Sequence, residues 1–470
     1  EHPYITYEND FIESEWWALK EIWKKGLLYE GYKVVPYCPR CGTPLSSHEV
    51  AQGYKDVTER SAMVEFKAKD GDYSFLAWTT TPWTLPSNMA LCVNPAVDYV
   101  KVQVGDKKYI LAEALVDKVF EGVEGERQIL ERYKGKDLEY REYEPLYPYA
   151  VEKVKNQRGK KAFIVTCDDY VTTEDGTGIV HMAPAYGEDD NRVCQKYGVA
   201  FVNLVNSKGE LTAETDWPGL FVKKADPLIL ADLEKKGLLF KAPEFTHSYP
   251  HCWRCKHPII FRATEQWFCS VAKFRDDVYK AIDTVTWMPD WGHDRMKGMV
   301  RDRNDWCISR QRTWGVPIPA FYCKKCGTYH ITDATIKAVS ALFRKEGSDA
   351  WYKYDAEQII PAGEVCEKCG ASEWMKDTDI MDVWFDSGST HYASMKRDQN
   401  FWPADMYLEG LDQYRGWFQS SLLTAVGALG KGAPFKECVT HGWTVDGEGK
   451  AIHKSLGNGM DPYEIMDKYG

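Results

Sequence analysis

The stretch "PYCPRCGTP" at residues 36–44 sets two cysteines in a turn rich in glycine and proline. Three later stretches repeat this C-x-x-C pattern, at "HCWRCKHP" (251–258), "FYCKKCGT" (321–328) and "EVCEKCGAS" (364–372). A tight turn that carries two thiolates supplies half of a tetrahedral zinc site, so the four turns predict two structural zinc sites. Redox-active pairs are the alternative, although none of the four has thioredoxin-like surroundings. The candidate ligands are Cys38, Cys41, Cys252, Cys255, Cys323, Cys326, Cys366 and Cys369.

The region between the first two cysteine turns has the pattern of a domain of its own. From about residue 55 to residue 246, short runs such as "YSFLAWTTT" and "GTGIVHMAP" are rich in β-branched and aromatic residues, and glycine and charged residues separate them. The two cysteine turns lie just outside its ends, so one zinc site would close the neck of an insertion. We predict a β-rich inserted domain here.

The flanks of this insertion have the pattern of an α/β core. "FIESEWWALKEIWKKG" (11–26) carries apolar residues at helical spacing, and its final glycine is placed to end the helix. Further along, "LLTAVGALG" (422–430) is typical of a helix and "ECVTHGWTV" (437–445) of a buried strand. Strands that alternate with helices are typical of an α/β nucleotide-binding core.

Composition narrows the possible functions. The chain has 470 residues, 44% of them hydrophobic, which is enough for about two to four domains. The formal charge of −11 argues against a general nucleic-acid coat, but a local basic surface would still suit an RNA backbone. No signal peptide is evident and no apolar run approaches the roughly 18 residues of a membrane span, so we expect a cytoplasmic protein with no membrane or DNA partner. We expect the six other cysteines to be small buried residues.

Six motifs along the chain resemble those of class I isoleucyl-tRNA synthetases, in the order found in that family. The closely related valyl and leucyl enzymes share the architecture, but "TTTPWT" and "RTWGVPIP" favour isoleucine as the amino acid. The motifs are "WTTTPWTLPSN" (78–88), "GTGIVHMAPAYGEDD" (176–190), "WCISRQRTWGVPIP" (306–319), "DVWFDSGST" (382–390), "LEGLDQYRGWF" (408–418) and "KSLGN" (454–458).

The resemblance implies a partial Rossmann-type synthetase core, an inserted β-rich editing domain and two zinc-knuckle modules. It implies that the cysteines of residues 38–41 pair with those of 252–255, and those of 323–326 with those of 366–369. It also implies two structural zinc ions, ATP with magnesium and isoleucine as substrates, tRNA(Ile) as partner, and a monomer. The expected segments are 1–54 (end of the first catalytic half, with a knuckle), 55–246 (editing domain), 247–320 (knuckle and return to the core), 321–372 (second zinc-binding insertion) and 373–470 (second catalytic half, with the lysine-serine loop).

An editing site has a chemical reason that does not depend on the motifs. Valine lacks one methylene of isoleucine, and a hydrophobic pocket separates the two by only about 1 to 3 kcal/mol, a limit for which this family is itself the standard example. A second, hydrolytic pocket then has to remove valine. No metal is expected to take part in that hydrolysis.

The resemblance assigns the residues of this pocket. Asp190 would anchor the α-amino group, since a carboxylate suits an ammonium. His181 would set the size of the pocket and contact the terminal ribose or the substrate. The residues expected to line the site and position water are Thr79, Thr80, Thr81 and Asn88, and the expected catalytic residues are Asp190, Thr80 and Thr81. The structural alternatives are a surface strand for the threonines and a turn with a satisfied histidine for the second motif.

The resemblance also implies half of a site that activates isoleucine with ATP. The ammonium of Lys454 would stabilise charge on the pyrophosphate side, with Ser455 and His441 as further ATP-binding residues. Ala451, Ile452 and His453 stand where lysine, methionine and serine are usual, so one of two usual cations is absent. The expected substrate-binding residues are Glu409 at the aminoacyl-adenylate, Gly410, Asp412 and Gln413 near ribose and amino acid, and Trp384 and Trp417 as walls of the isoleucine pocket. Core packing is the alternative for the tryptophans.

The family's other signature, His-x-Gly-His, does not occur in this sequence. We therefore expect a fragment that is not competent for synthesis but keeps the editing site. Two alternatives remain open, a free-standing deacylase and a non-catalytic, zinc-stabilised RNA-binding module. An in-frame His-x-Gly-His in the upstream gene sequence would support the fragment.

Overall fold

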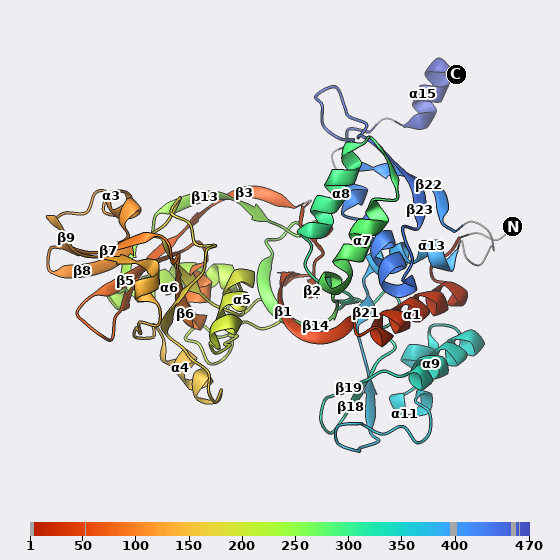
Figure 1. Cartoon of the computed structure of the whole chain (residues 1–470), viewed down its shortest axis with the longest axis horizontal. Coiled ribbons are helices and arrows are strands. Elements are labelled where there is room, and N and C mark those ends of the chain that lie inside the picture. The colour runs from red at the N-terminus through yellow and green to blue at the C-terminus, as the bar shows by residue number, and fades with distance from the viewer. Residues whose placement is uncertain (1–3, 52, 395–401, 453–456, 460) are drawn as a thin grey trace. The chain divides into compact units, whose positions relative to one another are not determined.

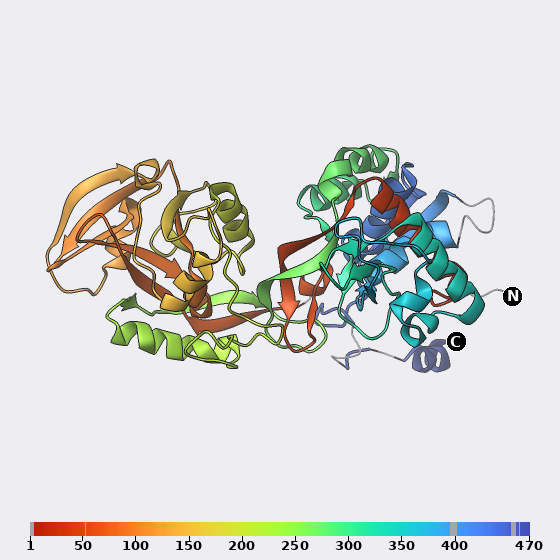
Figure 2. The same cartoon turned by 90° about the horizontal axis from the view of Figure 1, so that it is seen from below.

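The computed structural model describes residues 4–51, 53–394, 402–452, 457–459 and 461–470 (Figure 1 and Figure 2). The chain divides into two compact units, one of residues 32–265 and the other of residues 1–31 with 266–470. It leaves the second of these in strand β1 (Leu28–Cys38) and returns to it in β14 (Ile260–Cys269). Both units contain helices and sheets, so the predicted mixed α/β fold is confirmed.

A nine-stranded sheet forms the centre of the 32–265 unit. Its main path has the order β10-β6-β11-β5-β8-β7-β9, and β4 pairs with β5 and with β12. Most of these strands are buried, whereas β9 exposes nearly every side chain, and its charges protect a free sheet edge. The strands are β4 (Ala62–Lys67), β5 (Ser74–Thr79), β6 (Ala90–Val93), β7 (Asp98–Val104), β8 (Lys107–Ala112), β9 (Arg127–Lys134), β10 (Ile164–Cys167), β11 (Ile179–Met182) and β12 (Leu239–Lys241).

Shorter elements complete this unit. Helix α5 has three acidic residues in its first turn, where their negative charge interacts favourably with the helix dipole. The helix ends at Gly198, which has the left-handed conformation with φ of 67°. Strands β3 (Tyr54–Arg60) and β13 (Glu244–Pro250) form an antiparallel ribbon. The helices are α2 (Ser47–Ala51), η1 (Pro82–Ser87), η2 (Glu113–Leu115), α3 (Val116–Val119), η3 (Gly135–Leu138), α4 (Pro148–Lys155), α5 (Glu188–Tyr197) and α6 (Val222–Lys235).

The other unit is built around a parallel sheet of three strands in the order β15-β23-β22. Helix α1 (Asn9–Lys24) buries Trp16, Leu19 and Ile22 at helical spacing in the core of this unit. The strands are β15 (Thr286–Met288), β22 (Ala404–Gly410) and β23 (Phe435–His441), and the further helices are η4 (Val271–Phe274), α7 (Arg275–Ile282), α8 (Trp291–Arg301), α12 (Val383–Gly388), α13 (Thr390–Ala393), η5 (Leu411–Tyr414), α14 (Trp417–Thr424), the π-helical η6 (Ala425–Leu429) and α15 (Pro462–Tyr469).

A small module with its own sheet, in the order β19-β18-β20, belongs to the same unit. Its first helix, α9, begins after Thr332, whose hydroxyl accepts the Thr335 amide hydrogen at 3.1 Å and caps the helix. The elements are β18 (Phe321–Cys323), β19 (Tyr329–His330), α9 (Asp333–Glu346), α10 (Ala350–Lys353), α11 (Ala356–Ile359) and β20 (Trp374–Lys376).

Several predictions from the sequence can be compared with these elements. The helix that ends before Gly26 and the helix and strand near residues 422–445 are confirmed as α1, α14 with η6, and β23. The prediction that all six cysteines outside the four turns are buried is wrong for Cys307, which is partly exposed in β16 (Trp306–Cys307), an edge strand of its sheet. In the described part of the chain, no helix combines the length and apolar character of a membrane span.

Candidate functional sites

The eight cysteines of the C-x-x-C turns form two clusters of four. In each cluster the four sulfur atoms lie within 4.8 Å of one another, and the closest pairs, such as Cys38 with Cys255 and Cys323 with Cys369, are 3.5 Å apart. Tetrahedral zinc with Zn–S bonds of about 2.3 Å would hold its sulfurs about 3.8 Å apart. Each cluster therefore fits one zinc ion, and the structure pairs the turns as the resemblance implied.

The predicted threonines lie where strand β5 ends and helix η1 begins. Thr79 Oγ1 accepts the Thr81 amide hydrogen at 3.1 Å, and the Thr84 hydroxyl donates to the Thr81 carbonyl at 2.8 Å, so the turn is tightly held. Thr80 and Thr81 are partly exposed. The Thr80 hydroxyl makes no hydrogen bond to any described residue, so it is free to contact a substrate or a water molecule.

Strand pairing brings His181 to this turn. Trp78 of β5 and Val180 of β11 are partners in a parallel pair, so Thr79 and His181, one residue further along, lie on the same face of the sheet. Burial lowers the pKa of His181 to about 3, so its ring is neutral. The ring therefore has one nitrogen that donates and one that accepts.

A chain of hydrogen bonds fixes which nitrogen carries the proton. Asn88 Nδ2 donates to the Ala90 carbonyl at 3.0 Å and also lies 2.8 Å from His181 Nδ1, which must then accept. His181 Nε2 therefore donates to Thr84 Oγ1 at 2.9 Å, and Thr84 donates to Thr81. At the far end, the Tyr143 hydroxyl donates to Asn88 Oδ1 at 2.6 Å. The chain thus runs from the core of the unit to the threonine turn.

The burial and hydrogen bonds of Asn88 and His181 indicate that both support the threonine turn. Their exposed fractions are 2% and 5%, and all their side-chain polar atoms are engaged within the chain. The structure places both behind the threonine turn, where they hold Thr84 and Thr81. Their predicted direct roles at the substrate stay predictions.

Two residues that the sequence reasoning missed support the same turn. Tyr143 begins the hydrogen-bond chain, and no motif marks it. Asp226 of α6 accepts the Trp83 amide hydrogen at 2.7 Å at the start of η1, and burial raises the pKa of this carboxyl to about 7. Each lies far from the turn in sequence, so neither periodicity nor spacing identifies it.

Tyr143→Phe tests whether the hydrogen-bond chain stabilises the fold. The change leaves the buried Asn88 carbonyl oxygen without its donor, so we expect the free energy of unfolding in urea to fall by about 1 to 3 kcal/mol. Tyr140→Phe is the matched control, because Tyr140 is 50% exposed. Equal stability of the two variants would contradict the role given to Tyr143.

Asp190 lies in the first turn of α5, shortly after the end of the strand that carries His181. Its Oδ2 accepts the Ala183 amide hydrogen at 2.8 Å. A Cβ atom at Gly187 would lie 2.4 Å from the Asp190 carboxyl carbon, so a larger residue there would displace this carboxyl. Burial, with a smaller effect of Asp189, raises the pKa of Asp190 to about 7. Near neutral pH this carboxyl is therefore poised to ionise when a cation binds.

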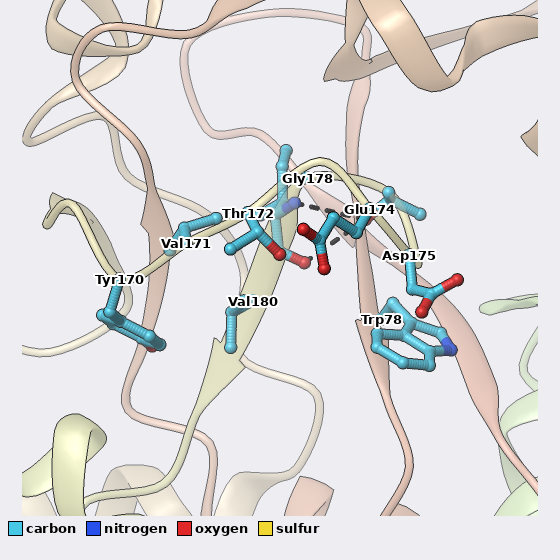
Figure 3. Close-up of a pocket in the computed structure, with 10 residues that line it drawn as sticks. Trp78, Tyr170, Val171, Thr172, Glu174, Asp175, Gly178 and Val180 are labelled. Atoms are coloured by element: carbon cyan, nitrogen blue, oxygen red, sulfur yellow. Dashed lines mark hydrogen bonds between the residues drawn. The ribbon is translucent and has the colours of Figure 1, made fainter. Parts of the chain in front are cut away.

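A cavity of about 230 Å³ lies on the other side of the strand pair (Figure 3). Trp78 and Val180 line it, which places it on the sheet face opposite Thr79 and His181. Glu174 and Asp175 give it an acidic rim, and Lys118 pairs with Asp175 at 3.0 Å. None of the predicted editing residues lines this cavity, so it is distinct from the threonine turn.

In the other unit, the predicted residues of the synthetic half meet at one sheet edge. Gly410 and His441 are partners at the carboxyl ends of the parallel strands β22 and β23, where ligands bind in open α/β sheets. A Cβ atom at Gly410 would lie 3.0 Å from Asp412 Oδ1 and 3.7 Å from His441 Cε1. Glu409 and His441 are exposed. The edge therefore presents one acidic and one imidazole side chain to solvent.

The two predicted tryptophans lie beside Gln413. Its Oε1 accepts the Trp417 amide hydrogen at 2.9 Å, and a Cβ atom at Gly416 would lie 2.5 Å from the same oxygen and 2.8 Å from the Trp384 ring. Trp417 stacks on Tyr407 with ring centroids 3.9 Å apart. Both tryptophans are only partly buried, so they are available as walls of a pocket. Lys454 and Ser455 lie outside the described residues.

The whole chain, residues 1–470, matches the family described as tRNA synthetases class I (I, L, M and V). The chain belongs to this family. The class I synthetase family that the sequence motifs predicted is thus confirmed.

Similar proteins include isoleucine–tRNA ligases of Thermoanaerobacter sp. (strain X514) and Caldanaerobacter subterraneus subsp. tengcongensis. Each is 46% identical over 486 and 485 residues, respectively, and each alignment covers 100% of this chain and 50% of the relative. The chain therefore spans about half the length of the curated relatives it matches. Among solved structures, a LeuRS-tRNA-LeuAMS ternary complex of Agrobacterium radiobacter K84 aligns over 99% of this chain and 56% of that chain, with 18% identity and a TM-score of 0.37.

Proposed function

We propose that this class I synthetase chain is the editing part of an isoleucyl-tRNA synthetase, together with one half of its synthetic site. In this proposal the parent protein joins isoleucine to tRNA(Ile) with ATP and magnesium. The 32–265 unit then hydrolyses valine that was attached by mistake. The relatives that cover the whole chain at 46% identity are isoleucine–tRNA ligases, which favours isoleucine over the other amino acids of the family.

The observation that carries the editing proposal is the braced threonine turn with Asp190 near the same strand end. The free Thr80 hydroxyl suits a water molecule that attacks the ester, and the Asp190 carboxylate suits the substrate's ammonium. In this proposal the His181 network positions the turn and takes no part in a chemical step. In this proposal the structural zinc ions would fix the four cysteine turns and supply no step of the hydrolysis.

The direct experiment measures hydrolysis of Val-tRNA(Ile) by this chain, with Ile-tRNA(Ile) as the substrate that should be spared. We expect faster release of valine than of isoleucine, since the smaller side chain enters an editing pocket that excludes the larger. Equal, uncatalysed rates for both substrates would contradict the proposal.

The pH dependence of this hydrolysis is a further expected result. Because burial raises the pKa of Asp190 to about 7, the carboxylate form is lost as the pH falls below that value. We expect the rate at low substrate concentration to fall about tenfold per pH unit below pH 7 and to level off above it. A rate–pH profile from pH 5.5 to 8.5 checks this, and a flat profile would remove Asp190 as the anchor.

A further inference from the structure

The first pair of cysteine turns, at 38–41 and 252–255, carries an exposed basic face. Arg40, Arg254, Lys256 and His257 are all exposed. Among the described residues, no carboxylate lies within ion-pair distance of Arg40, Arg254 or Lys256. Glu49, the acidic residue in contact with these turns, accepts from the Trp253 indole at 2.9 Å. This unpaired positive charge stands out in a chain of net charge −11.

The second pair of turns has the same geometry but balanced charge. Lys325 and Lys368 occupy the positions of Arg40 and Arg254, just before the second cysteine of each turn. Around them, however, Lys324 pairs with Glu357 at 2.7 Å, and Glu367 lies next to Lys368 in the sequence. The unpaired basic face is therefore not a requirement of the four-cysteine fold.

The backbone at Lys256 gives independent support. In all four turns the residue after the second cysteine donates its amide hydrogen to the carbonyl of the first cysteine, at 2.7 to 2.9 Å. At three of the turns this residue is glycine, namely Gly42, Gly327 and Gly370, with φ of 69°, 68° and 70°. The fourth is Lys256, with φ of 60°, a conformation that disfavours side chains other than glycine. The chain thus keeps a lysine where glycine would relieve strain, and the Lys256 ammonium donates to the Trp253 carbonyl of the same turn at 2.5 Å, which fixes the position of this charge.

His257 sets the direction of Arg40. The histidine Nδ1 lies 2.8 Å from the Cys255 carbonyl and therefore donates to it, so Nε2 accepts from Arg40 Nη1 at 2.7 Å. The guanidinium is held through Nη1, and Arg40 is an exposed residue. A preorganised guanidinium binds a phosphate with less loss of side-chain freedom.

We propose that Arg40, Arg254 and Lys256 bind the phosphodiester backbone of an RNA strand. Guanidinium groups match phosphate oxygens in a two-pronged geometry, and a lysine adds a point charge. The zinc-fitted turns would hold the three cations beside one four-cysteine cluster. This inference rests on the proposed function in one respect, that the RNA is the tRNA whose ester is hydrolysed.

The test measures binding of a fluorescently labelled tRNA transcript by anisotropy at several salt concentrations. We expect Lys256→Gly to weaken binding several-fold and to reduce the slope of log affinity against log salt by about 1. The triple variant R40A/R254A/K256G should weaken binding at least about tenfold. Lys325→Ala, at the matched position of the charge-balanced turn, should bind as the unaltered chain does.

Fold controls separate lost contacts from lost structure. Lys256→Gly removes the strained conformation, so we expect its zinc content to be unchanged and its unfolding temperature to be equal or higher. Weaker RNA binding by a protein that is no less stable would support the surface. Unchanged binding by the triple variant, or an equal loss in Lys325→Ala, would contradict the proposed RNA-binding surface. Equal competition by polyglutamate of the same charge would also contradict it, because that result would favour an acidic protein as the partner.

Failure of this inference is distinct from failure of the proposed function. Hydrolysis of Val-tRNA(Ile) by the unaltered chain is measured in parallel with binding. If the unaltered chain hydrolyses Val-tRNA(Ile) but tRNA binding is unchanged in the triple variant, only the proposed RNA-binding surface is contradicted. Binding that depends on the cations, with no hydrolysis, refutes the editing proposal alone and supports the surface.

Discussion

Asp190→Asn is expected to lower the rate of Val-tRNA(Ile) hydrolysis by about 100- to 1000-fold at low substrate concentration. The neutral amide keeps the shape of the side chain and its contact to the Ala183 amide, but it cannot pair with the ammonium of the substrate. Loss of one partner of a desolvated charge pair costs about 3 to 4 kcal/mol, which corresponds to this range of rates. Single-turnover release of valine measures it.

The same substitution should not weaken the fold. The pKa of Asp190 is about 7 in the folded chain and about 3.9 in an unfolded chain, so the folded chain keeps a proton that the unfolded chain releases between these values. The contribution of this group to stability therefore falls as the pH rises from about 4 to 7. At pH 8 the buried carboxylate opposes folding, and Asp190→Asn should leave the free energy of unfolding unchanged or raised.

Asp189→Asn is the matched control for this prediction. Asp189 is the neighbouring residue of the same helical turn, but it is exposed and accepts from Arg192 at 3.0 Å. We expect this variant to hydrolyse Val-tRNA(Ile) at close to the unaltered rate. Equal rates for Asp190→Asn and the unaltered chain would remove the proposed anchor.

Cys252→Ser is expected to have the largest effect on stability. It removes one of four sulfurs from the first cluster, and metal binding at such sites contributes directly to folding, by about 10 to 16 kcal/mol in isolated zinc-finger peptides. We expect zinc content, measured by elemental analysis, to fall from about two ions per chain to one. Urea unfolding should shift to clearly lower concentration.

Cys307→Ser controls for loss of a thiol as such, because Cys307 is partly exposed and lies outside both clusters. This variant should keep about two zinc ions and near-normal stability. One zinc ion or none in the unaltered chain would contradict the reading of four half-sites. Two ions in Cys252→Ser would remove that cysteine from the ligand set.

The sequence predicted the local elements better than the long-range contacts. The C-x-x-C spacing indicated four half-sites, but their pairing came only from the family resemblance, since cysteines far apart in sequence leave no local signal. The resemblance likewise marked Asn88 and His181, but not that both are buried behind the turn. The hydrogen bond from Tyr143 to Asn88 joins residues 55 apart in the sequence, so it depends on tertiary packing and no local pattern predicts it.

One feature of the sequence predicts the backbone conformation at Lys256. Alignment of the four cysteine turns shows glycine after the second cysteine in three and Lys256 in the fourth. The left-handed conformation at that position could have been inferred from the three glycines. The raised pKa of Asp190, in contrast, depends on burial that no local pattern shows.

The separation of the cysteines in the first cluster has a consequence during synthesis of the chain. Cys38 and Cys255 are 217 residues apart, whereas Cys323 and Cys369 of the second cluster are 46 apart. The ribosome adds about 5 to 20 residues per second. Synthesis of Cys255 therefore follows synthesis of Cys38 by roughly 10 to 40 seconds, whereas Cys369 follows Cys323 by only about 2 to 9 seconds. If the clusters bind zinc, the early thiols of the first cluster thus wait longest for their metal, and the nascent chain would be most exposed to oxidation or to binding of another metal in that interval.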